Sequence, residues 1–245
     1  MTELAHFDAR GLRIAYRRRD GRGPTIVFLP GYMSDMEGGK ASAVDAWAEA
    51  QGRAMLRFDY GGCGASTGAF EAQSLADWRD DALAVVDSLV AGPVVLVGSS
   101  MGGWLMLLAA LARPERVAGL VGIAPAPDFT GWGFSEEQKD EIVRAGRIEE
   151  PSPYGEPPYV TTRRFWESGE ALKLLGGAVA IDAPVRLLHG LDDADVPWRI
   201  SLELLERLRS SDVQATLVKG GDHRLSRPTD LALLTATVEK LLESL

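Results

Sequence analysis

A serine flanked by glycines stands where a nucleophile can be held at a tight turn. Residues 98–102 read Gly-Ser-Ser-Met-Gly, and they follow the apolar run 94–97 and precede the apolar segment 104–112. A strand, a G-x-S-x-G motif and a helix in this order are typical of a strained turn that exposes a serine hydroxyl above a sheet. The glycines lack the Cβ atoms that would collide in such a turn. Only Ser100 fits the spacing, so the motif predicts Ser100 as the nucleophile.

The general base can be chosen from the three histidines of the chain. His6 falls in the first predicted strand, and His189 ends a buried apolar run, where we expect a structural role joining backbone groups. His223 follows the last predicted strand in a glycine-containing loop. Catalytic groups of open parallel sheets collect at the carboxyl ends of the strands. These positions predict His223 as the base.

The acid comes from a group of carboxylates that follows a predicted strand. The segment 189–197 reads H-G-x-x-D-x-x-V-P, which places the acid at Asp193. Asp192 and Asp195 are then expected to face solvent or to form the turn. Asp128 follows the preceding predicted strand and is an alternative acid, as is Asp192. The order serine, acid, histidine along the chain agrees with a Ser-His-Asp triad on an α/β sheet.

Two backbone amides are expected to bind the oxyanion. One is the N–H of Met101, which follows the nucleophile at the start of a helix, and the other is the N–H of Tyr32 in the loop 30–34. Acyl transfer through Ser100 needs no cofactor, because the serine, the base and the acid carry the chemistry. No group of His, Asp and Glu has metal-ligand spacing, so no metal is expected either.

Short apolar, β-branched runs alternate with helical patterns along the chain. The predicted strands are 7–9, 13–18, 25–29, 55–58, 94–97, 120–123, 185–188 and 215–218. The predicted helices are 41–50, 75–89, 104–112, 200–209 and 231–245. This alternation predicts the α/β class: a mostly parallel central sheet with helices on both faces, after a short antiparallel pair. We interpret residues 1–245 as a single domain.

The stretch 128–182 interrupts this alternation. It holds a helical segment at 135–145, a proline-rich piece at 150–158 and a second helical segment at 162–175. We expect this insertion to form a lid, with a simple surface excursion as the alternative. Its aromatic residues either line an acyl pocket or pack the insertion onto the body. These residues are Trp132, Phe134, Phe165 and Trp166.

Composition excludes several classes of partner. The net charge of −9 disfavours nucleic acid, which needs clustered basic residues. The sequence has no uninterrupted run of about 18 apolar residues, so no membrane span is expected. The first residues lack the basic and apolar regions of a secretory signal, and the single cysteine, Cys63, has no disulfide partner in the chain. We therefore expect a cytoplasmic protein; its oligomeric state is not indicated.

These segments together resemble the α/β-hydrolase superfamily over nearly the whole chain. The resemblance is closest to bacterial hydrolases similar to the animal mitochondrial enzyme that removes S-palmitoyl groups and hydrolyses acyl glucuronides. The segments that carry it are 28–32, 39–41, 57–64, 97–104, 189–198 and 222–224. Carried over position by position, the triad is again Ser100, Asp193 and His223. The mitochondrial compartment does not transfer, and the substrate transfers weakly because the insertion 128–182 shapes the pocket.

The resemblance implies a serine esterase or thioesterase that acts through an acyl-enzyme. Its partner would be a small-molecule acyl ester or thioester. Two alternatives remain: an amide, peptide or carbon–carbon bond hydrolase of the same fold, and a binding module that uses the pocket without turnover.

Overall fold

The structure is a computed structural model that describes residues 2–152, 155 and 158–245. Part of the predicted proline-rich piece, residues 153, 154, 156 and 157, lies outside the described residues. Within the described ranges, no helix is both long and apolar enough to cross a membrane.

The centre of the molecule is an eight-stranded sheet in the order β1-β2-β4-β3-β5-β6-β9-β10. The first strand pairs antiparallel with the second, and the second antiparallel with β4; every other neighbouring pair is parallel. The predicted mostly parallel sheet after an antiparallel pair is therefore confirmed. The strands are β1 Leu4–Ala9, β2 Leu12–Arg19, β3 Arg22–Leu29, β4 Arg53–Phe58, β5 Val94–Ser99, β6 Val117–Ile123, β9 Val185–Gly190 and β10 Val213–Val218.

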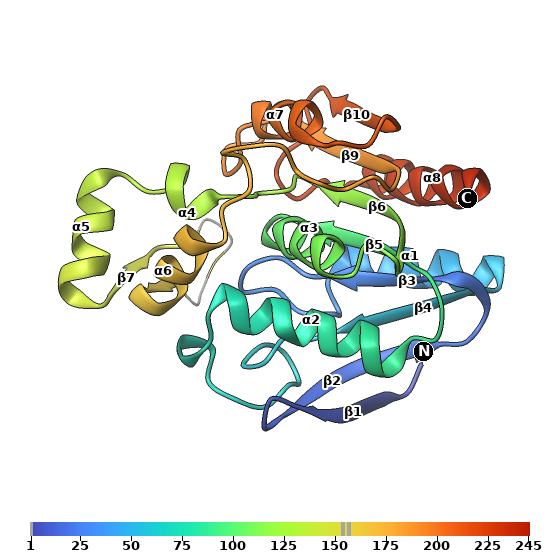
Figure 1. Cartoon of the computed structure of the whole chain (residues 1–245), viewed down its shortest axis with the longest axis horizontal. Coiled ribbons are helices and arrows are strands. Elements are labelled where there is room, and N and C mark those ends of the chain that lie inside the picture. Colours follow the sequence, from blue (N-terminus) through green and yellow to red (C-terminus); the bar gives the residue numbers. More distant parts are fainter. Residues whose placement is uncertain (1, 153–154, 156–157) are drawn as a thin grey trace.

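Helices cover both faces of this sheet (Figure 1). They are α1 Gly39–Gln51, α2 Leu75–Leu89, α3 Met101–Ala112, α7 Arg199–Arg207 and α8 Pro228–Ser244, with a short 3-10 helix η1 Phe70–Ala72. Helices α2 and α3 lie against one face, and α1 and α8 against the other. Side chains alternate across each strand, so Leu29 packs in the apolar cluster under α2 and α3 whereas its neighbour Phe28 packs under α1 and α8.

The insertion leaves the sheet after β6 and returns at β9, and it lies beyond the ends of the strands (Figure 1). Its elements are α4 Phe129–Trp132, α5 Glu136–Ala145, β7 Arg147–Glu150, β8 Tyr159–Thr162 and α6 Arg163–Ala171. The two predicted helical segments are present, but the second ends at Ala171. Strands β7 and β8 pair with each other only, as an antiparallel hairpin that the sequence did not predict.

Several polar segments follow parallel strands at their carboxyl ends. The loop 30–34 follows β3, Ser100 follows β5 and Asp128 lies after β6. The segment containing Asp193 follows β9, and His223 lies in the loop between β10 and α8. Because the parallel strands end at the same edge of the sheet, all these residues gather there, beside the insertion.

Candidate active site

Ser100 occupies the strained turn that its motif predicts. Its backbone has φ 54° and ψ −122°, a conformation that non-glycine residues rarely adopt. A Cβ on Gly98 would lie 2.4 Å from the carbonyl oxygen of Gly102, and a Cβ on Gly102 would lie 2.1 Å from that of Leu29. Both positions therefore require glycine. The turn is closed by a hydrogen bond from the Ser100 N–H to the carbonyl of Ile123, at 2.9 Å.

The structure brings Ser100, His223 and Asp193 into one chain of contacts. The Nε2 atom of His223 lies 3.1 Å from the Ser100 Oγ, and its Nδ1 atom lies 2.8 Å from Asp193 Oδ2. A carboxylate accepts only, so Nδ1 carries the proton and Nε2 is left to accept one from the serine hydroxyl. The His223 side chain is mostly buried, and that of Asp193 has no exposed surface.

Asp193 is held by more donors than His223 alone. Its Oδ1 accepts the N–H groups of Asp195 and Val196 at 2.9 and 2.8 Å, and its Oδ2 lies 3.2 Å from Nε2 of the buried His189. Burial by itself would raise the pKa of the Asp193 carboxyl, but the hydrogen bonds from His189, His223 and the backbone outweigh it and lower this pKa. Asp193 therefore stays ionised at neutral pH.

His189 has a role that the sequence showed only in part. Its Nε2 lies 3.0 Å from the carbonyl oxygen of Val196, in line with the expected contact to the backbone. The same atom also faces Asp193, and its Nδ1 lies 2.7 Å from the Ser201 Oγ. With two acceptors beside it, Nε2 is the protonated nitrogen, so the Ser201 hydroxyl donates to Nδ1. His189 thus orients the carboxylate that orients His223.

The two alternative acids have other surroundings. Asp192 is exposed, as is Asp195. Asp128 is buried, and its two carboxylate oxygens accept the N–H groups of Leu174 and Leu175, each at 2.8 Å. Burial raises the pKa of Asp128 even though these two donors lower it. Asp128 joins the start of the insertion to its end, and the contact to His223 Nδ1 is made by Asp193.

The two predicted oxyanion donors belong to the start of α3 and to the loop after β3. Met101 is the first residue of α3, so its N–H has no acceptor within the helix. Tyr32 belongs to the loop 30–34, called here the oxyanion loop, and among the described residues no acceptor is found for its N–H. The loop passes close to the nucleophile, because a Cβ on Gly31 would lie 3.4 Å from the Cβ of Ser100.

A cavity of about 820 Å³ opens over Ser100 and His223. Of the four aromatic residues proposed from the sequence, Trp132 and Phe134 line it, whereas Phe165 and Trp166 do not. Phe165 is buried in the core between α2 and the insertion, and the Trp166 Nε1 donates to the Thr130 carbonyl at 3.0 Å. Of the two alternatives left open for these aromatic residues, packing of the insertion is the one that fits Phe165 and Trp166, because α6 turns both side chains away from the cavity. Further lining residues from the insertion are Phe129, Glu150, Tyr159 and Thr161.

Lys40 is a further cavity residue that the sequence did not single out for chemistry. It lies in the first turn of α1, and its Nζ donates to the carbonyl oxygen of Arg224, next to His223, at 2.5 Å. Burial lowers the pKa of this ammonium to about 8. Only its place in the segment 39–41 of the family resemblance had drawn attention to it.

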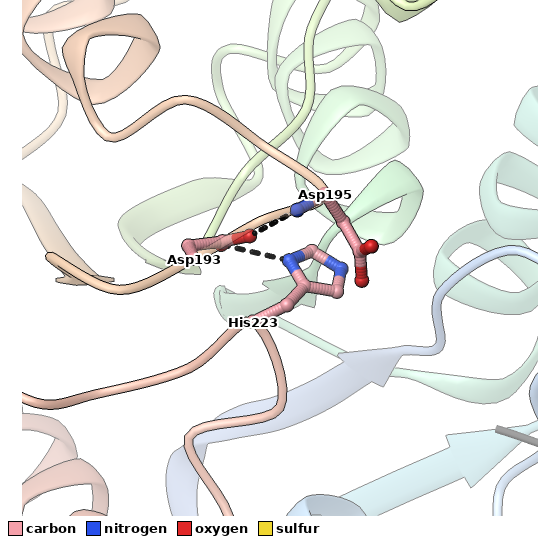
Figure 2. A group of neighbouring side chains, drawn as sticks. All are labelled: Asp193, Asp195 and His223. Carbon is pink, nitrogen blue, oxygen red and sulfur yellow. Dashed lines mark hydrogen bonds and ion pairs between the residues drawn. The ribbon is translucent and has the colours of Figure 1, made fainter. Parts of the chain in front are cut away.

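Asp193, Asp195 and His223 offer ligand atoms that all lie within 4.8 Å of one another. Figure 2 shows the backbone nitrogen of Asp195 pointing at one Asp193 oxygen and the imidazole of His223 at the other. Both oxygens of Asp193 thus already accept hydrogen bonds from the protein. A metal bound to this carboxylate and to His223 would replace the proton that lies between them. The arrangement therefore fits a hydrogen bond between Asp193 and His223 better than a metal site.

Comparison with known proteins places this site in a family. The chain is 42% identical to the human mitochondrial palmitoyl-protein thioesterase ABHD10 over 236 residues, which are 95% of this chain and 77% of the relative. A sequence model of the family described as Serine aminopeptidase, S33 matches residues 23–136.

Solved structures agree with these matches. Alpha/beta hydrolase domain-containing protein 10 from mouse superposes with a TM-score of 0.93 at 40% identity, covering 99% of both chains. A putative hydrolase from Agrobacterium vitis S4 superposes with a TM-score of 0.91 at 38% identity, covering 98% of both chains. The chain therefore belongs to the α/β-hydrolase family, as a hydrolase of the branch that includes the ABHD10 thioesterases.

Proposed function

We propose that this chain is a serine hydrolase that cleaves carboxylic esters or thioesters through an acyl-enzyme on Ser100. The observation that carries the proposal is the position of the His223 imidazole, 3.1 Å from the Ser100 Oγ and 2.8 Å from the buried Asp193 carboxylate. A serine hydroxyl is a weak nucleophile until an adjacent base takes its proton, and this imidazole has the position and the tautomer for that step.

The reaction proceeds in two halves. Ser100 attacks the acyl carbonyl while His223 Nε2 takes its proton, and the resulting imidazolium gives that proton to the leaving alcohol or thiol. Water then attacks the acyl-enzyme with His223 again as base. Asp193 stabilises the imidazolium in both halves, and the N–H groups of Tyr32 and Met101 donate to the negatively charged oxygen of each tetrahedral intermediate.

The substrate class follows from the cavity and from the relatives. A volume of about 820 Å³ suits a small molecule or an acyl chain, and the insertion contributes the apolar side chains of Phe129, Trp132 and Phe134. The human relative is named as a palmitoyl-protein thioesterase. Esters and thioesters also have better leaving groups than amides, so they demand less of His223 as a general acid.

Three further expectations belong with this proposal. We infer that residues 128–182 act as a lid within a single domain of residues 1–245. We also propose the cytoplasm as the compartment, on the basis of the buried free thiol of Cys63. Cell fractionation tests the compartment, since recovery of the native protein in mitochondria or the periplasm would contradict it. Limited proteolysis with and without a covalent inhibitor tests the lid, because closure over the inhibitor would slow cleavage within 128–182.

The test of the activity is a substrate panel. Purified protein and its Ser100→Ala variant are assayed on p-nitrophenyl esters, acyl-coenzyme A thioesters and acyl p-nitroanilides of matched chain length. We expect Ser100-dependent turnover of esters and thioesters, with anilides much slower. If the anilides were cleaved faster than the matched esters, the amide or peptide alternative would replace this proposal. If no substrate in the panel were cleaved, the chain would instead be treated as a binding module.

A further inference from the structure

Tyr32 connects the nucleophile turn to the insertion. Its backbone belongs to the oxyanion loop, where the preceding Gly31 passes 3.3 Å from the Ser99 carbonyl oxygen, measured from a Cβ built on the glycine. Its side chain points away into the insertion, and its hydroxyl donates a hydrogen bond to the carbonyl of Val160 in strand β8. These two residues are 128 positions apart in the sequence.

The ring of Tyr32 is surrounded by aromatic side chains from both sides of this junction. The ring centroids of Phe165 and Phe129, both in the insertion, lie 5.0 and 6.1 Å from it. Those of Phe70 and Trp78, in the body, lie 5.3 and 5.9 Å from it. Burial in this cluster raises the pKa of the Tyr32 phenol, so the hydroxyl keeps its proton and remains a donor at neutral pH. The side chain is therefore fixed at its ring and at its hydroxyl.

On either side of Tyr32, the loop after β3 is hydrogen-bonded to the body. The Tyr60 hydroxyl donates to the Pro30 carbonyl at 3.3 Å, and the Met36 N–H donates to Asp59 Oδ1 at 2.7 Å. Tyr32 lies between Pro30 and Met36, and its hydroxyl is hydrogen-bonded to the insertion. The next residue, Met33, has a backbone φ of 51°, in the left-handed region. A displacement of the insertion would thus act on the loop at Tyr32, the residue whose N–H is the expected oxyanion donor.

We propose that the Tyr32 side chain is a positioning residue that couples the oxyanion loop to the insertion, so that the Tyr32 N–H is correctly placed only while its phenol is bound to β8. This inference rests on the proposed acyl-enzyme mechanism. It assigns the side chain a function separate from that of the backbone amide. The amide of Tyr32 donates to the oxyanion, and the phenol of the same residue ties the position of this amide to the position of the insertion.

The test removes the hydroxyl and keeps the ring. Tyr32→Phe is compared with Tyr16→Phe, the same change on strand β2, where the ring packs edge-on against Phe7 and does not line the cavity. The measurements are kcat and KM on p-nitrophenyl butyrate and Ki for phenylboronic acid, which forms a tetrahedral adduct with an active-site serine. Oxyanion contacts are made in the transition state and not in the bound substrate, so a misplaced donor lowers kcat and leaves KM unchanged.

For Tyr32→Phe we expect kcat to fall about five- to tenfold, the factor of one hydrogen bond of ordinary strength, with KM within about twofold. The Ki for the boronate should rise by the same factor, and Tyr16→Phe should match the wild type in all three values. A kcat within twofold of the control, or a loss confined to KM, would overturn the proposal.

A second variant changes the insertion and leaves Tyr32 intact. Phe165→Leu removes the ring nearest to Tyr32 on the insertion side, and it should lower kcat and raise the boronate Ki in the same proportion, again without a change in KM. If Phe165→Leu folded and kept the wild-type kcat, the insertion would not act on the oxyanion loop. Failure of the underlying mechanism would look different, because the wild-type protein itself would then lack turnover that depends on Ser100.

Discussion

Replacing Asp193 by asparagine changes one atom at the buried end of the proposed triad. The Oδ1 of Asp193 accepts the N–H groups of Asp195 and Val196, so an asparagine keeps its carbonyl oxygen there. Its NH₂ group then takes the place of Oδ2, facing His223 Nδ1 at 2.8 Å and His189 Nε2 at 3.2 Å. A donor in this position forces the proton of His223 onto Nε2, where it faces Ser100 and blocks proton transfer from the hydroxyl.

The expected magnitude follows from this tautomer. An enzyme left with the wrong imidazole tautomer loses roughly 10³- to 10⁴-fold in kcat, or about 4–5.5 kcal/mol of transition-state stabilisation. The assay is kcat on p-nitrophenyl butyrate, with the rate of fluorophosphonate labelling as a second readout. Asp192→Asn is the matched control because Asp192 is exposed and adjacent, and it should cost less than tenfold. A loss of less than tenfold in Asp193→Asn would refute the assignment of Asp193 as the acid.

The same variant has a pH signature in stability. Hydrogen bonds lower the pKa of Asp193 in the folded state, so the ionised carboxylate stabilises the fold at neutral pH. This contribution is present above the unfolded pKa of about 4 and is lost as the pH falls toward the folded value. The difference in free energy of unfolding between wild type and Asp193→Asn should therefore shrink below about pH 4, as measured by urea denaturation. A difference that stays constant down to pH 2 would contradict the lowered pKa.

Three further changes test other parts of the site. Lys40→Met removes an ammonium whose pKa is lowered to about 8, and it should stabilise the fold by about 1–3 kcal/mol below pH 8. This gain should shrink as the pH rises above about 8 and should vanish only well above the unfolded pKa of about 10.5, where the side chain is neutral in both states. A gain independent of pH in thermal melts would contradict the shift. In the wild type, kcat/KM should rise roughly fourfold for each methylene added to the acyl chain. Trp132→Ala should change this dependence on chain length, whereas Trp166→Ala, outside the cavity, should leave it unchanged. The opposite result would place Trp166 in the pocket and Trp132 in the packing of the insertion. In Asp128→Asn, the side-chain NH₂ group faces one of the two backbone N–H groups of residues 174–175, so a hydrogen bond is lost. The free energy of unfolding should fall by about 1–3 kcal/mol, while kcat falls less than tenfold. A much larger loss of kcat would move the acid to Asp128.

The fold was readable from the sequence where local chemistry alone dictates the structure. The glycines at 98 and 102 are required by backbone clashes within one turn, and the apolar runs 94–97 and 120–123 are buried on both faces of the sheet. Such constraints act between near neighbours or through burial of whole segments. The sheet, its helices and the loops that carry Ser100 and His223 could therefore be predicted.

The insertion was less readable because its structure depends on contacts between distant residues. The strands β7 and β8 are four residues each and pair with one another, and no strand was predicted for either of them. Likewise, the side-chain directions of Phe165 and Trp166 depend on which face of a nine-residue helix meets the body. Neither feature leaves a periodic pattern long enough to be recognised in the sequence.

The support around the triad was also hidden for this reason. The contact of His189 with Asp193 depends on the turn after β9, and the approach of Lys40 to the loop of His223 spans 184 positions. A polar residue that ends a buried strand is a usable signal, and in His189 it indicated a structural role without showing which carboxylate it holds.

The central claim is that Ser100 becomes acylated. Intact-mass spectrometry of acid-quenched enzyme after reaction with a slow p-nitrophenyl ester measures this directly, with peptide mapping to locate the adduct. Cys63 is the natural competing nucleophile, but it is buried and its thiol pKa is raised to about 12, so it should remain unmodified. We expect one acyl group on the peptide that contains Ser100, and none in Ser100→Ala. Acylation of another residue, or equal turnover by Ser100→Ala without any adduct, would contradict the mechanism.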